Sequence, residues 1–127
     1  MKNNRTYHCG IEATLDLIGG KWKALILWRL LEKPLRFNEL CRQIPHVSPK
    51  ILTQQLREME GSRLVDRKAF PVVPPKVEYS LTSFGRSLLP ILEVMCAWGN
   101  EYLKQIDPAD APHRENHGQD LEKPFHN

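Results

Sequence analysis

The sequence predicts a mainly α-helical domain that carries a small β-hairpin, on three observations. Between Val47 and Glu60, apolar residues recur at the spacing that places them on one side of a helix. After Gly61 the pattern becomes extended, and two short runs with alternating apolar residues flank a proline-rich turn. The third observation is a long, strongly apolar helical pattern from Ser83 to Ile106.

The amino-terminal third predicts two helices. Ile11, Leu15 and Ile18 recur along one side of a short helix, which Gly19-Gly20 ends. The second helix runs from about Trp22 to Glu32 and is apolar on most sides, as a central helix must be.

The next segment predicts two helices joined by a tight turn. Leu35-Arg36-Phe37 is too short for more than an edge strand, and a compact helix follows over Asn38–Ile44. Pro45-His46-Val47 forms the turn, after which Ser48 is a good N-cap and Pro49 suits the first helical position. A compact helix, a three-residue turn and a second helix form a helix-turn-helix by their spacing.

The second of these helices has two different faces. Leu52, Leu56 and Met59 line the side that we expect to be buried. Helix-turn-helix proteins contact base edges with the early residues of this helix, using side chains of the kind found on its other side. The alternative is a solvated face with no partner. The polar side chains in question are Lys50, Thr53, Gln54 and Arg57.

The extended runs predict a β-hairpin over Leu64–Phe70 and Lys76–Leu81, with a stiff tip of three prolines and two valines. In the second run Val77, Tyr79 and Leu81 alternate with polar residues, which is typical of a half-buried strand. A hairpin after a helix-turn-helix is the wing of a winged helix-turn-helix fold, and basic wings commonly meet the DNA backbone or minor groove. The alternative is a plain solvated hairpin. Its cations are Arg67, Lys68 and Lys76.

The last helix, capped by Thr82, has more apolar surface than one domain can bury, and Pro90 predicts a kink or break near Leu89. Two adjacent apolar stripes suggest two neighbours: the core of the domain and a second subunit. One stripe contains Leu88, Ile91, Met95, Trp98 and Tyr102; the other contains Leu89, Leu92, Cys96, Leu103 and Ile106.

Length and charge favour one basic domain over residues 1–106, followed by a disordered polar tail over residues 107–127. The tail has two cationic and five acidic residues, a net charge of −3. Because the whole chain has a net charge of +3, the preceding 106 residues carry +6. A basic body favours an anionic partner. The first residues lack a secretory signal and the longest apolar run, Ala24 to Trp28, is too short for a membrane span. We therefore expect a cytoplasmic protein that does not enter a membrane.

The sequence contains no complete motif for a phosphate-binding loop or a zinc site. Gly19-Gly20-Lys21 lacks the upstream glycine of a phosphate loop, and Trp22 replaces its Ser or Thr. The pairs His8 with Cys9 and His113 with His117 lack further zinc ligands at motif spacing. We expect no cofactor and no metal. The three cysteines, Cys9, Cys41 and Cys96, should be thiols, the last two small core residues.

Four segments together resemble one known family. They are Cys9 with Thr14–Lys23, Leu35–Leu40, Leu52–Glu60 and Val73–Thr82, and in unbroken order they resemble the HxlR-type bacterial transcription regulators, which are winged-helix proteins related to the MarR group. The resemblance spans about residues 9 to 103. It implies a homodimer that binds pseudo-palindromic operator DNA near promoters, with the first and last helices at the interface.

Carried over by position, the family's recognition helix falls on residues 49–60 and its wing on residues 65–80. Its amino-terminal cysteine, which in some members senses electrophiles or oxidants, falls on Cys9. The chain departs from many relatives by having Gly10 rather than proline after this cysteine, and its tail lacks the second cysteine of some relatives. The alternative for Cys9 is an unreactive thiol docked at the dimer interface. Positive charge near this thiol would favour its reactive thiolate form, and four residues are close enough in sequence to supply that charge if the first helix folds back on the second: Arg5, His8, Lys21 and Lys23.

The expected function is therefore a dimeric transcription regulator bound to double-stranded DNA, with a small electrophile or oxidant as a candidate signal at Cys9. Two other functions would leave different features in the sequence. A winged-helix module for binding proteins would show acidic or apolar residues on the outer face of residues 50–57, where we expect none. A thiol enzyme around Cys9 would need a base and a pocket, and the sequence shows neither. The expected DNA contacts are Lys50, Thr53, Gln54 and Arg57 in the major groove, Ser48 and Arg36 on phosphates, and Lys76 with Arg67 or Lys68 from the wing. The candidates for the dimer interface are Ile11, Leu15, Met95, Trp98 and Tyr102.

Overall fold

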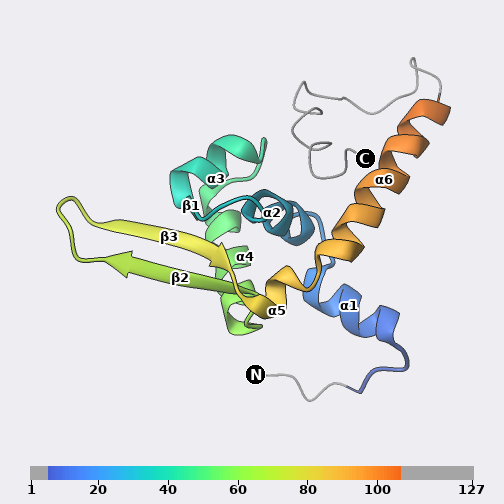
Figure 1. Ribbon diagram of the computed structural model, residues 1–127, viewed down its shortest axis with the longest axis horizontal. Helices are drawn as coiled ribbons and strands as arrows, with labels where there is room; N and C mark the ends of the chain where they lie inside the picture. The colour runs from blue at the N-terminus through green and yellow to red at the C-terminus, as the bar shows by residue number, and fades with distance from the viewer. Residues whose placement is uncertain (1–5, 107–127) are drawn as a thin grey trace. The chain divides into compact units, whose positions relative to one another are not determined.

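The computed structural model describes residues 6–106, which fold into helices and one three-stranded antiparallel sheet (Figure 1). The predicted fold class is confirmed. The chain divides after Ser87 into two compact units, each considered by itself. The first contains α1 (Gly10–Ile18), α2 (Lys23–Leu30), β1 (Leu35–Arg36), α3 (Phe37–Gln43), α4 (Pro49–Gly61), β2 (Val65–Phe70), β3 (Lys76–Leu81) and α5 (Ser83–Arg86); the second contains α6 (Leu89–Gln105).

The core of the first unit is formed by α2 and the elements around it. Ile26, Leu27 and Leu30 of α2 are fully buried, which confirms its prediction as the central helix. Leu25, on its remaining side, is 41% exposed. The other fully buried large side chains come from β1, α3, α4, β2 and their connections: Leu35, Leu40, Ile44, Leu52, Leu56, Met59, Leu64 and Val65.

The turn between α3 and α4 forms where the sequence predicts it. His46 has a φ of 73°, a left-handed conformation in which histidine is enriched among residues with a side chain. Gly20, between α1 and α2, has a φ of 88°, which only glycine adopts without strain. These two turns set the directions in which α2 and α4 start.

The sheet has the order β1-β3-β2, so the two-residue β1 is an edge strand, as predicted. Arg36 pairs with Glu78 of β3, and Glu78 pairs on its other side with Lys68 of β2. The predicted alternation of burial along β3 is wrong, because residues 76–80 are all half-buried. As the central strand, β3 has neighbours on both sides. Within β3, Lys76 Nζ lies 3.4 Å from the carboxylate of Glu78, two residues along the same strand.

The predicted break in the last helix is confirmed. Thr82 caps the four-residue α5 by accepting a hydrogen bond from the Gly85 N–H at 2.9 Å, and α6 starts at Leu89 with Pro90 in its first turn. Within residues 6–106, the region expected to form the last helix therefore contains two helices, α5 and α6. Among residues 6–106 no helix combines the length and apolar character that crossing a bilayer requires. The predicted tail over residues 107–127 lies outside the described residues.

Candidate nucleic-acid interface

The start of α4 is fixed by its own sequence. Ser48 Oγ accepts a hydrogen bond from the Ile51 N–H at 3.1 Å, and Pro49 occupies the first helical position, where its missing N–H costs nothing. One side of α4 is buried in the core through the side chains of Leu52, Leu56 and Met59. The opposite side is thereby held in a fixed orientation toward solvent.

The four predicted base-contacting residues lie together on this outer side. Lys50, Gln54 and Arg57 are exposed, whereas Thr53 is half-buried. The Thr53 hydroxyl donates to the Pro49 carbonyl oxygen at 2.8 Å, so its proton is used within the helix and its oxygen and methyl group remain for a ligand. Cationic, amide and methyl groups are the side-chain groups that bind base edges in the major groove.

Ile51 is a residue of this face that sequence reasoning missed. The expectation of a face without apolar residues over positions 50–57 is wrong, because the Ile51 side chain is 37% exposed. Ile51 lies in the first turn of α4 and directly precedes the fully buried Leu52. An exposed apolar group next to Lys50 can contact a thymine methyl group.

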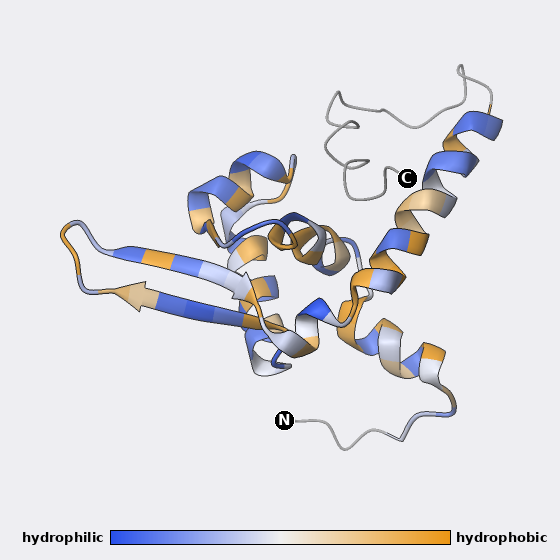
Figure 2. Cartoon of the chain, viewed as in Figure 1, coloured by the Kyte–Doolittle hydropathy of each residue, from blue (hydrophilic) through white to orange (hydrophobic). Residues whose placement is uncertain are grey.

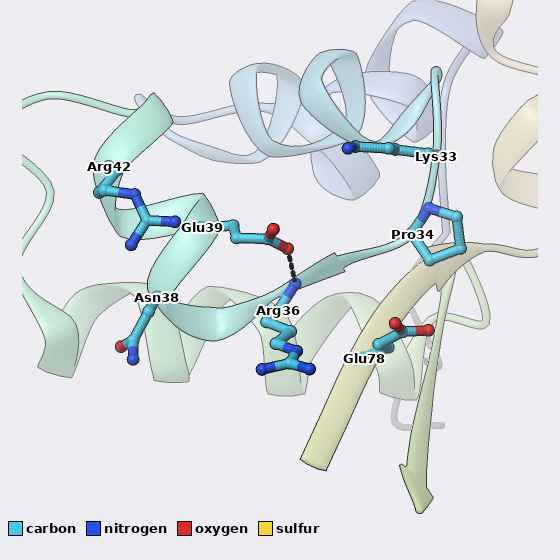
Figure 3. A pocket seen from close by; sticks show the side chains of 7 residues that line it. All are labelled: Lys33, Pro34, Arg36, Asn38, Glu39, Arg42 and Glu78. Carbon is cyan, nitrogen blue, oxygen red and sulfur yellow. Dashed lines mark hydrogen bonds between the residues drawn. The ribbon is translucent and has the colours of Figure 1, made fainter.

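Arg36 lines an open pocket at the start of α3 (Figure 3). The carboxylate of Glu39 turns back and accepts a hydrogen bond from the Arg36 backbone N–H at 2.8 Å, while the guanidinium of Arg36 points away from it. This backbone hydrogen bond, assisted by the nearby cations, lowers the pKa of Glu39. The other lining residues are Lys33, Pro34, Asn38, Arg42 and Glu78.

The pocket adds cations that sequence reasoning did not select. Arg42 is one of these additional cations. It lies four residues after Asn38 on α3, so helical spacing could have identified the two as neighbours. Lys33 comes from the turn before β1, and only the fold brings it beside Arg36. Together the three cations outnumber the two carboxylates of the pocket, which suits an anionic ligand.

The cations of the wing lie on two different faces. Lys68 and Lys76 both place Nζ over the ring of Phe70, at 5.0 and 4.7 Å from its centroid. Arg36, opposite Glu78 in the ladder, belongs to the same face. Arg67 pairs with Tyr79 and therefore points to the other face. The structure thus groups Lys68 with Lys76 and Arg36, and separates Arg67 from them.

Two helices, α1 and α6, carry several residues of high hydropathy, which are orange in Figure 2, and each helix is considered by itself. On α1, Ile11 is 71% and Leu15 61% exposed. On α6, Met95, Trp98 and Tyr102 are all exposed, and the rings of Trp98 and Tyr102 stack with centroids 5.8 Å apart. These five residues are the predicted candidates for a dimer interface, and each leaves apolar surface in solvent within a single chain.

Cys9 is the exposed N-cap residue of α1, whereas Cys41 and Cys96 are half-buried rather than core residues. The positive charge expected around Cys9 stays a prediction, but three of the expected residues have other contacts, since Lys21 Nζ lies 4.9 Å from the Trp22 ring centroid and His8 and Lys23 each contact a glutamate. His8 contacts Glu12 through both its backbone N–H and its Nδ1. Lys23 lies 2.7 Å from Glu58, and Arg5 is outside the described residues.

Metal ligands do not gather anywhere within residues 6–106: no group of three or more His, Cys, Asp or Glu side chains is close enough to hold an ion. The predicted absence of a metal site stays a prediction for the whole chain, because His113 and His117 lie outside this range.

Comparison with known proteins gives consistent relatives. A sequence profile described as HxlR-like helix-turn-helix matches residues 17–107. The chain is 52% identical over 101 residues to the uncharacterized HTH-type transcriptional regulator YkvN of Bacillus subtilis, covering 80% of this chain and 86% of YkvN. It is also similar to the redox regulator HypR in its oxidized form, with 48% identity, a TM-score of 0.71, and 73% and 96% of the two chains covered. The reduced form of YodB from B. subtilis matches with 34% identity and a TM-score of 0.68, covering 80% and 100%, and YodB has also been solved bound to a quinone.

Proposed function

The chain belongs to the HxlR-like helix-turn-helix family and is a transcription regulator of the helix-turn-helix type, and from this premise we propose that it acts as a homodimer on a pseudo-palindromic operator. The observation that carries the proposal is the outer side of α4. The cationic and amide side chains on this side of α4 are exposed to solvent, and the opposite, apolar side is fully buried. The N-terminus of α4 is capped by Ser48. A helix held in this way can enter the major groove without rearrangement.

Each side chain on α4 has a distinct role in the proposed complex. Arg57 and Lys50 match the two acceptors, O6 and N7, that guanine presents in the major groove. Gln54 matches the donor and acceptor of adenine, and the Thr53 methyl suits thymine. The operator half-site should therefore contain guanine and adenine contacts at fixed positions.

The phosphate contacts flank this helix on two sides. Ser48 Oγ uses an electron pair to accept the Ile51 N–H, so its hydroxyl proton is available for a phosphate oxygen. Arg36 offers its guanidinium from β1, with Lys33 and Arg42 adding charge beside it. From the wing we assign Lys68 and Lys76, which share a face with Arg36, in preference to Arg67. Such contacts add affinity without sequence preference.

Assembly through the first and last helices is supported by their apolar surfaces. Ile11 and Leu15 on α1, with Met95, Trp98 and Tyr102 on α6, would be an association liability if they stayed in water. In a two-fold dimer, two α4 helices would enter successive major grooves about 34–36 Å apart.

Cys9 is the candidate sensor in this proposal. The thiol is exposed, so an oxidant or electrophile can reach it, and it directly precedes α1, which we assign to the dimer interface. HypR is named a redox regulator and YodB has been solved with a bound quinone. Modification at this position would change the spacing of the two α4 helices without touching DNA.

The experiment that tests the proposal is selection of bound sequences from random duplex DNA by the full-length protein. We expect enrichment of an inverted repeat with half-site centres about 10–10.5 base pairs apart. Enrichment of a single unrepeated site would contradict the homodimer, and no enrichment over the starting pool would contradict sequence-specific binding altogether.

A further inference from the structure

Lys23 of α2 and the side chains of Glu58 and Gln54 on α4 form a connected row. We propose that Glu58, held by Lys23, is a positioning residue that orients the amide of Gln54 to select adenine in the operator. The inference rests on the proposed DNA-binding function. It assigns a role to Lys23 and Glu58, neither of which belongs to the predicted DNA-contacting set.

The first link joins two helices. Lys23 Nζ lies 2.7 Å from Glu58 Oε1, and the Lys23 side chain is only 14% exposed, so its ammonium is held in place by the protein. Lys23 is the first residue of α2 and follows the turn in which Gly20 has a φ of 88°. The turn before α2 thus places the Lys23 ammonium beside α4.

The second link fixes the direction of an amide. Gln54 Nε2 donates to Glu58 Oε2 at 3.4 Å, one helical turn further along α4. An ionised carboxylate can only accept hydrogen bonds. A flipped Gln54 amide would place its carbonyl oxygen against the carboxylate, so the Lys23–Glu58 pair favours one of the two amide orientations.

The favoured orientation determines which base fits. When Glu58 accepts the N–H that lies trans to the Gln54 carbonyl oxygen, the other N–H and the carbonyl oxygen remain side by side on the free edge of the amide. This edge matches adenine, which presents N7 as an acceptor and the N6 amino group as a donor. Guanine presents two acceptors at the same edge, so the carbonyl oxygen of the held amide would face an acceptor. A freely rotating amide could instead turn its N–H groups toward guanine.

Charge gives the two positioning residues opposite effects. A carboxylate near the DNA backbone repels phosphates, and Lys23 offsets this repulsion by pairing with it. Removing the charge of Glu58 should keep or raise the affinity for unrelated DNA while weakening base discrimination. Removing the charge of Lys23 should lower the affinity for every sequence, because one cation beside the Glu58 carboxylate is lost and the net charge of this surface becomes more negative.

The test uses the full-length protein and a set of duplexes, made from the selected operator by changing each half-site position to the other three bases. Gln54→Ala identifies the base pair that Gln54 contacts. At that half-site position, the ratio of affinities for the preferred base and the other bases should fall by roughly 5- to 150-fold. Glu58→Gln, which keeps size and shape, should weaken adenine discrimination at that same position by roughly 2- to 10-fold. Lys23→Met should weaken binding to all duplexes. Glu60→Gln makes the same chemical change at an exposed site of α4 and should leave every base preference intact.

Full adenine discrimination by Glu58→Gln would overturn the proposed positioning role while leaving the DNA-binding function intact. A base other than adenine at the position that Gln54 reads would overturn it too. A wild-type protein that enriches no sequence would instead remove the function on which the inference rests. Thermal unfolding of each variant separates loss of discrimination from loss of folding, and Glu58→Gln, at a side chain that is 45% exposed, is the decisive variant.

Discussion

Gly85 packs directly on the backbone of Leu64: a Cβ at Gly85 would lie 2.1 Å from the Leu64 carbonyl oxygen. The same carbonyl accepts a hydrogen bond from the Thr82 N–H at 3.1 Å, and the Thr82 hydroxyl donates to the Arg63 carbonyl at 2.7 Å. These contacts join the segment between α4 and β2 to the start of α5. The segment that follows α4 is therefore anchored by a backbone approach that only glycine permits.

We expect Gly85→Ala to lower the free energy of unfolding by about 1–3 kcal/mol, because the new methyl group can be accommodated only by moving backbone. Denaturant unfolding measures this change. Gly61→Ala is the matched control, since no atom lies within 4 Å of a Cβ placed there, and it should stabilise α4 by up to about 1 kcal/mol. Equal losses in the two variants would show that the close approach to Leu64 is not the cause.

Arg57 is the sharpest test of base recognition. If its guanidinium binds guanine O6 and N7, Arg57→Ala should cost roughly 1–3 kcal/mol of operator binding and relax the preference at that base. Arg57→Lys keeps the charge but loses the two-pronged geometry, so it should relax the preference with a smaller loss of affinity. Titration of operator and single-base variants measures both effects. Unchanged operator affinity for Arg57→Ala would refute the assignment.

The wing offers a test of which face meets DNA. Lys68→Gln or Lys76→Gln should weaken binding to all sequences alike, and should flatten the slope of log affinity against log salt by about 0.9 for each lost phosphate contact. Arg67→Gln removes one charge from the opposite face and should leave that slope unchanged. The reverse pattern would place the DNA against the Arg67 face.

Local chemistry explains which parts of this molecule were predictable. Ser48, Pro49 and the spacing of Leu52, Leu56 and Met59 fix α4 by interactions within a few residues, and Pro90 marks the break before α6. These features require no knowledge of distant residues. The predicted elements that they define are present in the structure.

Features that depend on long-range packing were missed. The Lys23–Glu58 pair joins residues 35 positions apart, and Lys33 reaches the Arg36 pocket only because β1 lies at the edge of the sheet. The half-buried state of all five residues 76–80 in β3 results from its central place in the sheet, which its own alternation does not reveal. Such properties belong to the assembled fold and have no signature in a local pattern.

Trp98 tests the proposed assembly. It is 69% exposed and stacks on Tyr102, a rigid aromatic pair of the kind that dominates interfaces. We expect Trp98→Ala to weaken dimerisation by about 2 kcal/mol, roughly 30-fold, in sedimentation equilibrium. Val73→Ala, at a 98% exposed apolar residue of the wing tip, should leave association unchanged. A wild-type protein that sediments as a monomer at micromolar concentration and still binds the palindrome would contradict the dimer.

Cys9 tests the proposed signal. Diamide or a quinone should change operator binding by the wild-type protein, and later reduction should reverse the effect of diamide. Cys9→Ser should bind operator normally and ignore both reagents. The half-buried Cys41 and Cys96 remain in that variant, so they serve as internal controls for reaction elsewhere.

The product formed on Cys9 indicates how the signal would act. A disulfide between subunits needs Cys9 of a second chain or Cys96 with Cα atoms about 4.4–6.8 Å apart, and it would appear as a covalent dimer on non-reducing gels. Without such a partner, a sulfenic acid or a small-thiol adduct is the expected product, and mass spectrometry of the intact protein identifies it. Either product sits at the start of α1 and should alter the assigned dimer interface. If wild type and Cys9→Ser respond alike, or if neither responds, Cys9 is not the switch and the signal must enter elsewhere.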